Sequence, residues 1–416
     1  MAKQIYLINA GKLIDGKTEK VFHNYSVLVE GSTIREVGPT DQITGNIGQD
    51  VPQHDYTSYT VVPGLIDCHV HLTMPGDGTP LEEAMDIPDE VITMRAAYNA
   101  KQALKAGTTT LREMGAKNRS TFILRESIQK NLAVGPRLLL SGRPITCTGG
   151  HMWMMGSQAD GPDDIRKEVR KLVKEGADFI KLVATGGATI GTVPYKVSYT
   201  LQELEAAVDE AHRHGRQAAI HVLSKQGVVN AIDAGGDLLV HCMFRSSDGT
   251  AAYDEQLANK IASSKIPVNP TLHVLRHRVW RLEEKAKNEG LNEEEKSLLD
   301  EEQQTLEMRL NMIRNLHQLG VKMLPGSDTA WYWYPVGQYV AELDALVQAG
   351  LKPIETLMLG TLETAKAIGE GSKLGSIEPG KLADLLIVDG DPSIDINALW
   401  NVKAVFQGGN QVDLTG

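Results

Sequence analysis

The sequence predicts an α/β protein in which a (β/α)8 TIM barrel is joined to a small β-sandwich domain built from both chain ends. Two patterns support this fold class. Apolar, β-branched runs recur eight times in the middle of the chain, and helical patterns fill most of the gaps. The two ends instead hold short β-rich runs with turn residues. A doubly wound open sheet is the competing fold, but its usual GxGxxG fingerprint is absent.

The two chain ends are predicted to share one domain, because neither has enough apolar residues for a core of its own. Residues 1–58 contain the runs IYLINAGKLIDG and YSVLVEGSTIREVG, with the Glu-Gly-Ser of VEGSTI as a hairpin turn. Residues 372–416 contain ADLLIVDGDP and VKAVFQGG. We therefore expect residues 59–371 to form a barrel inserted between the two parts of this domain.

The barrel strands are predicted from the eight apolar runs. In chain order these are 61–72, 107–114, 137–145, 178–186, 217–223, 237–244, 266–272 and 321–328. Two intervening helices are well delimited. Residues 161–176 open with Pro-Asp-Asp near their start and close on glycine, and residues 201–214 read LQELEAAVDEAHRH.

Residues 283–302 stand apart because they carry nine acidic residues and three lysines. We expect a solvated helix pair between the seventh and eighth strands. A mobile lid or a subunit contact is the alternative.

Charge and cysteine content exclude several classes of protein. The chain has 42 Lys and Arg against 53 Asp and Glu, a formal charge of −11, which argues against nucleic-acid binding. Its three cysteines are too few for a disulfide framework and fit a reducing compartment. No signal peptide or membrane span is recognised. We expect a cytoplasmic homo-oligomer with a small-molecule substrate.

A pair of histidines in IDCHVHL is the strongest chemical signal. His69 and His71 lie two apart on a predicted strand, so their side chains point to the same face, as metal chelation requires. His212 and His214 have the same spacing but end a helical pattern, where residues two apart diverge. We expect that second pair to have no role in a metal site.

Four further residues on other predicted strands complete the pattern: Lys181, His221, His241 and Asp328. Each alone has an ordinary structural explanation, such as an ion-paired lysine, a core histidine or a helix cap. Together they all fall at carboxyl ends of strands, which a barrel brings to one mouth. Imidazole and carboxylate-type oxygens suit zinc or a similar cation.

VVPGLIDCHVHL, the lysine, the two separated histidines, GSD and the tail GSIEPGKLADLLIVDGDP resemble the amidohydrolase superfamily over nearly the whole chain. Within it the chain looks most similar to the imidazolonepropionase-related branch, which includes prolidase-like (Xaa-Pro) dipeptidases and enzymes that attack carbamates and phenylureas. Imidazolonepropionases themselves use one metal and lack the bridging lysine, so Lys181 argues against that activity.

The resemblance implies two divalent metal ions, expected to be Zn²⁺. His69 and His71 would bind the more buried ion, and His221 and His241 the more exposed one. Lys181, carbamylated by carbon dioxide, would bridge them, and Asp328 would complete the buried site.

The expected chemistry is attack by a metal-bridging hydroxide on an amide carbonyl. Asp328 would accept the proton and pass it to the leaving amine. His151 in TGGHMW and Tyr199 in KVSYTL are the two candidates for stabilising the oxyanion, and similar positions occur in the prolidase-like relatives. A loop histidine and a packing tyrosine are the alternatives.

Substrate contacts are predicted from loops that follow the strands. Trp153 and Trp331 would favour an apolar or aromatic acyl group. Arg245, His273 and Arg276 could hold a substrate carboxylate. Packing rings and surface arginines are the alternatives.

These expectations favour hydrolysis of a dipeptide or an N-acyl amino acid. A carbamate or phenylurea hydrolase with the same metal site is the alternative within enzymes. A non-catalytic barrel homologue is a more distant one, but such a protein would be expected to lose metal ligands, and all six are present.

Overall fold

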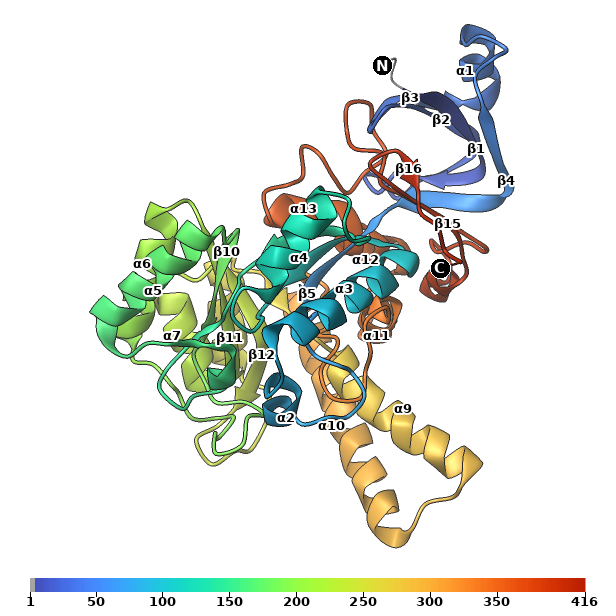
Figure 1. Ribbon diagram of the computed structural model, residues 1–416. Helices are drawn as coiled ribbons and strands as arrows, with labels where there is room; N and C mark the ends of the chain where they lie inside the picture. The colour runs from blue at the N-terminus through green and yellow to red at the C-terminus, as the bar shows by residue number, and fades with distance from the viewer. Residues whose placement is uncertain (1–3, 416) are drawn as a thin grey trace.

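The computed structural model describes residues 4–415. Both chain ends contribute to one seven-stranded sheet with the strand order β16-β15-β14-β4-β1-β2-β3. Its strands are β1 (Ile5–Ile14), β2 (Val21–Glu30), β3 (Thr33–Pro39), β4 (Gln53–Pro63), β14 (Leu385–Val388), β15 (Val402–Gln407) and β16 (Asn410–Gln411). The two ends meet where β14 pairs antiparallel with β4. Figure 1 shows this sheet at one end of the molecule, with helix α1 (Thr40–Asn46) beside it.

The predicted hairpin is present, because β2 and β3 pair antiparallel from Glu30 and Thr33. Gly31 in its turn has a φ of 62°, which glycine adopts without a Cβ penalty. All seven described strands lie in one sheet, so the predicted two-layered sandwich is not confirmed. Apolar side chains of non-neighbouring strands pack together in one core, which includes Tyr6, Ile8, Leu385 and Phe406.

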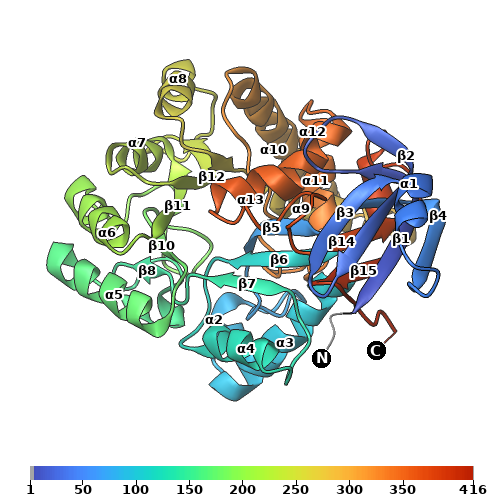
Figure 2. The ribbon, with the colours of Figure 1, turned by 90° about the horizontal axis from the view of Figure 1, so that it is seen from above.

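The middle of the chain holds parallel strands surrounded by helices (Figure 2). One sheet has the order β5-β6-β7, and the other has the order β13-β12-β11-β10-β8-β9. The strands are β5 (Leu65–Val70), β6 (Thr108–Glu113), β7 (Arg137–Leu140), β8 (Ile145–Thr146), β9 (Ser157–Gln158), β10 (Phe179–Val183), β11 (Gln217–Ser224), β12 (Leu238–Arg245) and β13 (Val268–Asn269). A shared apolar core of Cys68, Met114, Phe179, Val240 and Leu324 packs between them.

The two sheets are not closed by continuous ladders, which differs from the predicted eight-stranded barrel. The expected strand 137–145 is divided into β7 and β8, one in each sheet. Between them Gly142 has a φ of 70°, and a Cβ there would lie 2.7 Å from the Phe122 ring. The chain therefore turns at this glycine.

The last expected strand, 321–328, forms only isolated bridges, from Met323 to Val268 in β13 and from Thr329 to Val70 in β5. It therefore lies between the outer strands of the two sheets. Its close approach requires Gly326, because a Cβ at that position would lie 2.6 Å from the Cβ of His69.

The helices follow the strands as the sequence predicts. The expected helix 161–176 is α5, and the expected helix 201–214 is α6. Gly176, which follows the last residue of α5, has a left-handed backbone conformation. The helices of the body are α2 (Leu81–Met85), α3 (Asp89–Lys105), α4 (Ser120–Gln129), α5 (Gly161–Glu175), α6 (Leu201–Arg213), α7 (Lys225–Asp233), α8 (Glu255–Ser264), α11 (Tyr339–Gln348), α12 (Pro353–Met358) and α13 (Thr364–Ala367). Short turns of 3-10 or π type are η1 (Trp153–Met155), η2 (Leu359–Glu363) and η3 (Ile396–Trp400).

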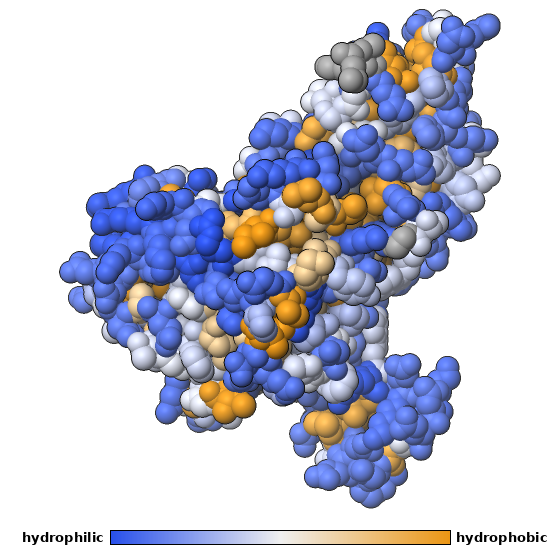
Figure 3. All heavy atoms as spheres, viewed as in Figure 1, coloured by the Kyte–Doolittle hydropathy of each residue, from blue (hydrophilic) through white to orange (hydrophobic). Residues whose placement is uncertain are grey.

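The acidic segment forms a helix pair, as expected. α9 (His273–Asn288) and α10 (Glu293–Gln318) project from the body as an arm (Figure 1). Asn292 and Glu295 form a capping box that starts α10. Most of the arm surface in Figure 3 is hydrophilic, with a few hydrophobic residues. Across residues 4–415, no helix is both long and apolar enough to cross a membrane.

Candidate active site

The carboxyl ends of the parallel strands surround one cavity of about 320 Å³. Five of the six predicted metal ligands line it: His71, Lys181, His221, His241 and Asp328. The sixth, His69, is fully buried and contacts Asp328. All six residues therefore lie at one place, as expected from their positions at the carboxyl ends of strands.

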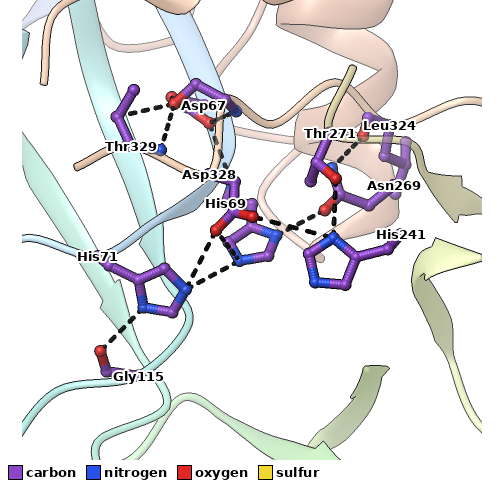
Figure 4. A network of polar contacts seen from close by, with 11 residues as sticks. Asp67, His69, His71, Gly115, His241, Asn269, Thr271, Leu324, Asp328 and Thr329 are labelled. Carbon is purple, nitrogen blue, oxygen red and sulfur yellow. Dashed lines mark hydrogen bonds and ion pairs between the residues drawn. The ribbon is translucent and has the colours of Figure 1, made fainter. Parts of the chain in front are cut away.

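Three of these residues converge most closely (Figure 4). The Nε2 atoms of His69 and His71 lie 3.1 Å apart. The Oδ1 atom of Asp328 lies 3.1 Å from the first and 3.3 Å from the second. Asp328 reaches this point because its backbone N–H donates to the carbonyl of His69, which holds the last segment against β5.

The second ring nitrogens of these two histidines are held by acceptors. His69 Nδ1 donates to Asn269 Oδ1 at 2.8 Å, and His71 Nδ1 donates to the Gly115 carbonyl at 3.0 Å. The Asn269 amide is oriented in turn, because its Nδ2 donates to the Leu324 carbonyl. Both Nε2 atoms therefore present lone pairs to a carboxylate and to each other. These lone pairs and the carboxylate repel one another, and a cation bound between them would remove that repulsion.

Burial and charge keep this site in its metal-binding protonation state. Desolvation and the Lys181 charge lower the pKa of His69 to about 4, against the opposing charge of Asp328. Desolvation also lowers the pKa values of His221 and His241 well below the ordinary value. Burial would raise the pKa of Asp328, but His69, His71 and His241 lower it well below 3.8. Near neutral pH, His69, His221 and His241 are therefore neutral and Asp328 is ionised.

His221 and His241 lie beside the triad with their rings 4.7 Å apart. His221 Nε2 donates to the Gly186 carbonyl at 3.0 Å, and His241 Nδ1 lies 2.7 Å from Thr271 Oγ1. The remaining nitrogen of each ring is thus left for a ligand. Among the described residues, however, only His69, His71 and Asp328 form a compact three-ligand group.

Lys181 projects from β10 into the cavity and is 1% exposed. Within residues 4–415 its amine has no hydrogen bond or ion pair with a neighbouring side chain. Desolvation lowers its pKa to about 7, although the charge of Asp328 acts in the opposite direction. A neutral buried amine is the form that reacts with carbon dioxide, so this lysine fits the predicted carbamate.

Of the two oxyanion candidates, only His151 lies at the cavity. Its Nδ1 is 2.8 Å from Thr189 Oγ1, and its ring lies 4.9 Å from that of His221. Tyr199 is placed elsewhere, because its buried hydroxyl donates to the Ala159 carbonyl at 2.8 Å. The structure therefore places Tyr199 in the apolar core of the body, away from the cavity lining.

Of the five residues expected to contact the substrate, two line the cavity and three do not. Arg245 and Trp331 line the cavity. Trp153 lies in the turn η1 and is 41% exposed, away from the cavity lining. His273 bonds to Gln338 and Glu342, and Arg276 pairs with Asp344.

His273 and Arg276 face away from the cavity because α9 begins at His273. Its first turn packs against α11, which carries Glu342 and Asp344. In this structure both residues therefore make contacts between helices and do not line the cavity.

The side chains of the second histidine pair diverge, as expected at the end of a helix. His212 bonds to Asp237 at 2.8 Å, whereas His214 bonds to Glu210 at 3.2 Å. Their side chains have separate carboxylate partners at the end of α6.

Several site residues were not recognised from the sequence. Asn269 ends β13 and Thr271 lies two residues further on, the same spacing that identified the first histidine pair. Arg309 lies in the middle of α10, where no sequence signal marks it. Its guanidinium donates to the backbone carbonyls of His241, Cys242 and Pro270.

Parallel strands with helical crossovers, and imidazoles and a carboxylate converging at the strand ends, are features typical of metal-dependent hydrolases. A model of the amidohydrolase family matches residues 60–412, and the chain belongs to this family. It is accordingly an enzyme that hydrolyses carbon–nitrogen bonds of small molecules, in a family whose members generally depend on metal ions.

The chain is also similar to individual hydrolases. The chain is 26% identical to an ochratoxinase of Aspergillus niger over 97% of this chain and 85% of that protein. A solved Xaa-Pro dipeptidase with bound methionine is 28% identical, with a TM-score of 0.83 over 98% of this chain and all of that one. Phenylurea hydrolase B is 21% identical, with a TM-score of 0.78 over 99% of this chain and 97% of that one, which shows a common fold alone.

Proposed function

We propose that the enzyme is a binuclear, zinc-dependent amidohydrolase that cleaves a dipeptide or an N-acyl amino acid. The observation that carries this proposal is the convergence of six ligand-type residues on one cavity, with a buried amine at Lys181. His69, His71 and Asp328 would hold one ion, His221 and His241 the other, and carbamylated Lys181 would bridge them. When bound, the ions supply an activated water and polarise the scissile carbonyl.

The chain's own residues would perform the remaining steps. Asp328 accepts the proton of the attacking water, and the same proton passes to the departing amine as the C–N bond breaks. Burial lowers the pKa of His151 to about 3, so its ring is neutral. With Thr189 Oγ1 donating to Nδ1, the ring proton lies on Nε2, which donates to the developing oxyanion. Arg245 pairs with the carboxylate of the substrate amino acid.

The aromatic lining supports an apolar or aromatic substrate group. The Trp331 ring lies 5.3 Å from the ring of His71 and 5.7 Å from that of His151, and Tyr332 and Tyr334 also line the cavity. Two similar proteins have names that refer to an ochratoxin and to Xaa-Pro dipeptides. The same lining would also accept an aryl carbamate or phenylurea, which is the second candidate.

The test is a hydrolysis screen with the metal-loaded protein. Dipeptides and N-acyl amino acids form one panel, and aryl carbamates and phenylureas form the other. We expect turnover in the first panel, with about two zinc ions per chain by elemental analysis. Turnover confined to the second panel would replace the proposed substrate class, and a single ion at full activity would contradict the binuclear site.

We further propose that residues 1–58 and 372–416 form one domain around the 59–371 hydrolase domain, in a cytoplasmic homo-oligomer. The pairing of β4 with β14 supports the shared domain. Light scattering of the purified protein tests the oligomeric state.

A further inference from the structure

A second cavity lies beside the active site, where the arm leaves the body of the molecule. Its volume is about 250 Å³, and residues of α9, α10 and the loop 332–334 line it. We call it the arm cavity. The residues that matter here are Arg278 and Arg281 from α9, Leu298 from α10, and the loop residues Tyr332, Trp333 and Tyr334.

The arm cavity adjoins the catalytic one. Arg278, Tyr332 and Tyr334 line both, so the partition between them is one side chain thick. Tyr332 is held over the mouth by a hydrogen bond of 3.5 Å from its hydroxyl to the Ala188 carbonyl. A bond of this length is weak, so a substrate group can displace the Tyr332 ring and extend from one cavity into the other.

The walls of the arm cavity favour an aromatic group. Trp333 is 50% exposed and Leu298 is 44% exposed, although both are large apolar residues. Covering this surface with an aromatic ring would remove apolar area from water and bring the ring into contact with the tryptophan.

The charge of the arm cavity favours an anion on that group. Arg278 has a carboxylate partner, Glu302, at 3.3 Å. The Arg281 guanidinium lies over the Trp333 ring, 4.8 Å from its centroid. No described residue supplies a carboxylate within ion-pair distance of Arg281, and Glu302 is the only acidic residue that lines the cavity. One positive charge is therefore left for a ligand.

We propose that the arm cavity binds the distal end of the acyl chain of the substrate, an aromatic ring that bears a carboxylate. Arg281 is its counter-ion, and Trp333 is its main apolar contact. This inference rests on the proposed function for the position of the scissile bond, and it adds the chemical class of the far end of the substrate.

The first test measures binding without hydrolysis. Titration calorimetry of the metal-loaded protein with 2-naphthoate and with neutral 2-naphthamide compares wild type, Arg281→Gln, Arg281→Lys, Trp333→Ala and Lys296→Gln. Lys296 is the matched control, because it lies on the arm outside the cavity and pairs with Glu293. We expect Arg281→Gln and Trp333→Ala to weaken naphthoate binding roughly five- to tenfold.

The control variant should bind naphthoate like wild type, and Arg281→Lys should retain most of the affinity. Naphthamide should bind weakly to every variant. Equal naphthoate affinity in wild type and Arg281→Gln, or binding that the Lys296 control weakens as much, overturns the assignment.

The second test uses two N-acyl phenylalanines, one with an acetyl group and one with a 4-(4-carboxyphenyl)butanoyl group. Arg281→Gln should raise KM for the long substrate roughly five- to tenfold and leave KM for the short one and kcat for both unchanged. If neither is cleaved but naphthoate binding depends on Arg281, the proposed function fails and the arm cavity stands. If both are cleaved with the same KM in wild type and Arg281→Gln, the arm cavity fails alone.

Discussion

At the scale of single residues, the close triad makes metal binding depend on His69. Its Nε2 faces both His71 and Asp328, so removing the ring leaves a carboxylate and one imidazole. His69→Ala should lower metal content by at least one ion per chain and reduce hydrolysis at least about 100-fold. His212→Ala is the matched control, because its ring bonds only to Asp237 at the surface, and it should keep full metal content. Elemental analysis with full metal in His69→Ala would contradict this site.

Lys181 gives a second residue-scale prediction. Acidic removal of metal should release carbon dioxide, since the proposed carbamate on Lys181 and bound metal ions would stabilise each other. Reactivation by zinc should then require bicarbonate, and Lys181→Ala should lose the binuclear centre, with partial rescue by a short carboxylic acid. Mass spectrometry of the native protein and activity in carbon-dioxide-free buffer are the measurements. Full recovery from zinc alone would leave Lys181 as a structural lysine.

Arg309 is expected to position His241 rather than to touch substrate. His241 and Cys242 have φ values of 62° and 53°, so their carbonyls leave the regular ladder and are received by this guanidinium. Arg309→Met would leave buried carbonyls without a donor, which costs about 3 kcal/mol in unfolding free energy. Metal content should fall from two ions toward one, because His241 loosens while the triad remains.

The matched control for that change is Arg314→Met on the same helix. Arg314 donates to the carbonyls of Gln348 and Ala349, away from the site. It should lower the stability measured by urea unfolding without changing the metal content. Equal metal loss in both variants would show that Arg309 acts only through the fold of α10.

At the scale of elements, the arm separates metal binding from substrate recognition. Deleting residues 283–302 and rejoining the flanks removes Leu298 and Glu302, which line the arm cavity, but none of the residues that line the catalytic cavity. The variant should keep both metal ions and cleave short N-acyl substrates, while its affinity for 2-naphthoate falls. Loss of metal with a native circular dichroism spectrum would place the acidic segment in the site.

The elements also show where strand prediction from sequence succeeds. Runs bounded by turn residues located β5, β10, β11 and β12 well, because these strands are buried on both faces. The runs at 137–145 and 321–328 do not form single continuous strands, because the chain turns at Gly142 and makes a close approach at Gly326. Local apolar pattern does not report such interruptions, which arise from close contacts with distant side chains.

At the scale of the whole molecule, stability should carry a pH dependence from Glu342. Burial raises the pKa of this carboxyl to about 8, although the His273 N–H opposes the shift. The native state therefore keeps a proton that the unfolded chain releases near pH 4.5. The resulting stabilisation is complete below pH 4.5 and is lost as pH rises to about 8, by about 1.4 kcal/mol per pH unit.

Glu342→Gln isolates this contribution, because glutamine has no proton to lose. The unfolding free energy of this variant relative to wild type should rise steadily between pH 5 and pH 8. Urea unfolding of both metal-loaded proteins at several pH values measures it. Parallel pH profiles would show that Glu342 is ionised in the native state.

The sequence by itself determined the family, the alternation of strands and helices, and the six ligand-type residues at the strand ends. This follows because strand periodicity is local, and a parallel α/β ring carries every strand end to the same mouth. Only the tertiary structure decided which loop residues reach the cavity. Tyr199, His273 and Arg276 turn away, while Arg309 enters from the arm, because helices packed against partners tens of residues away set those directions. No local pattern encodes such long-range packing.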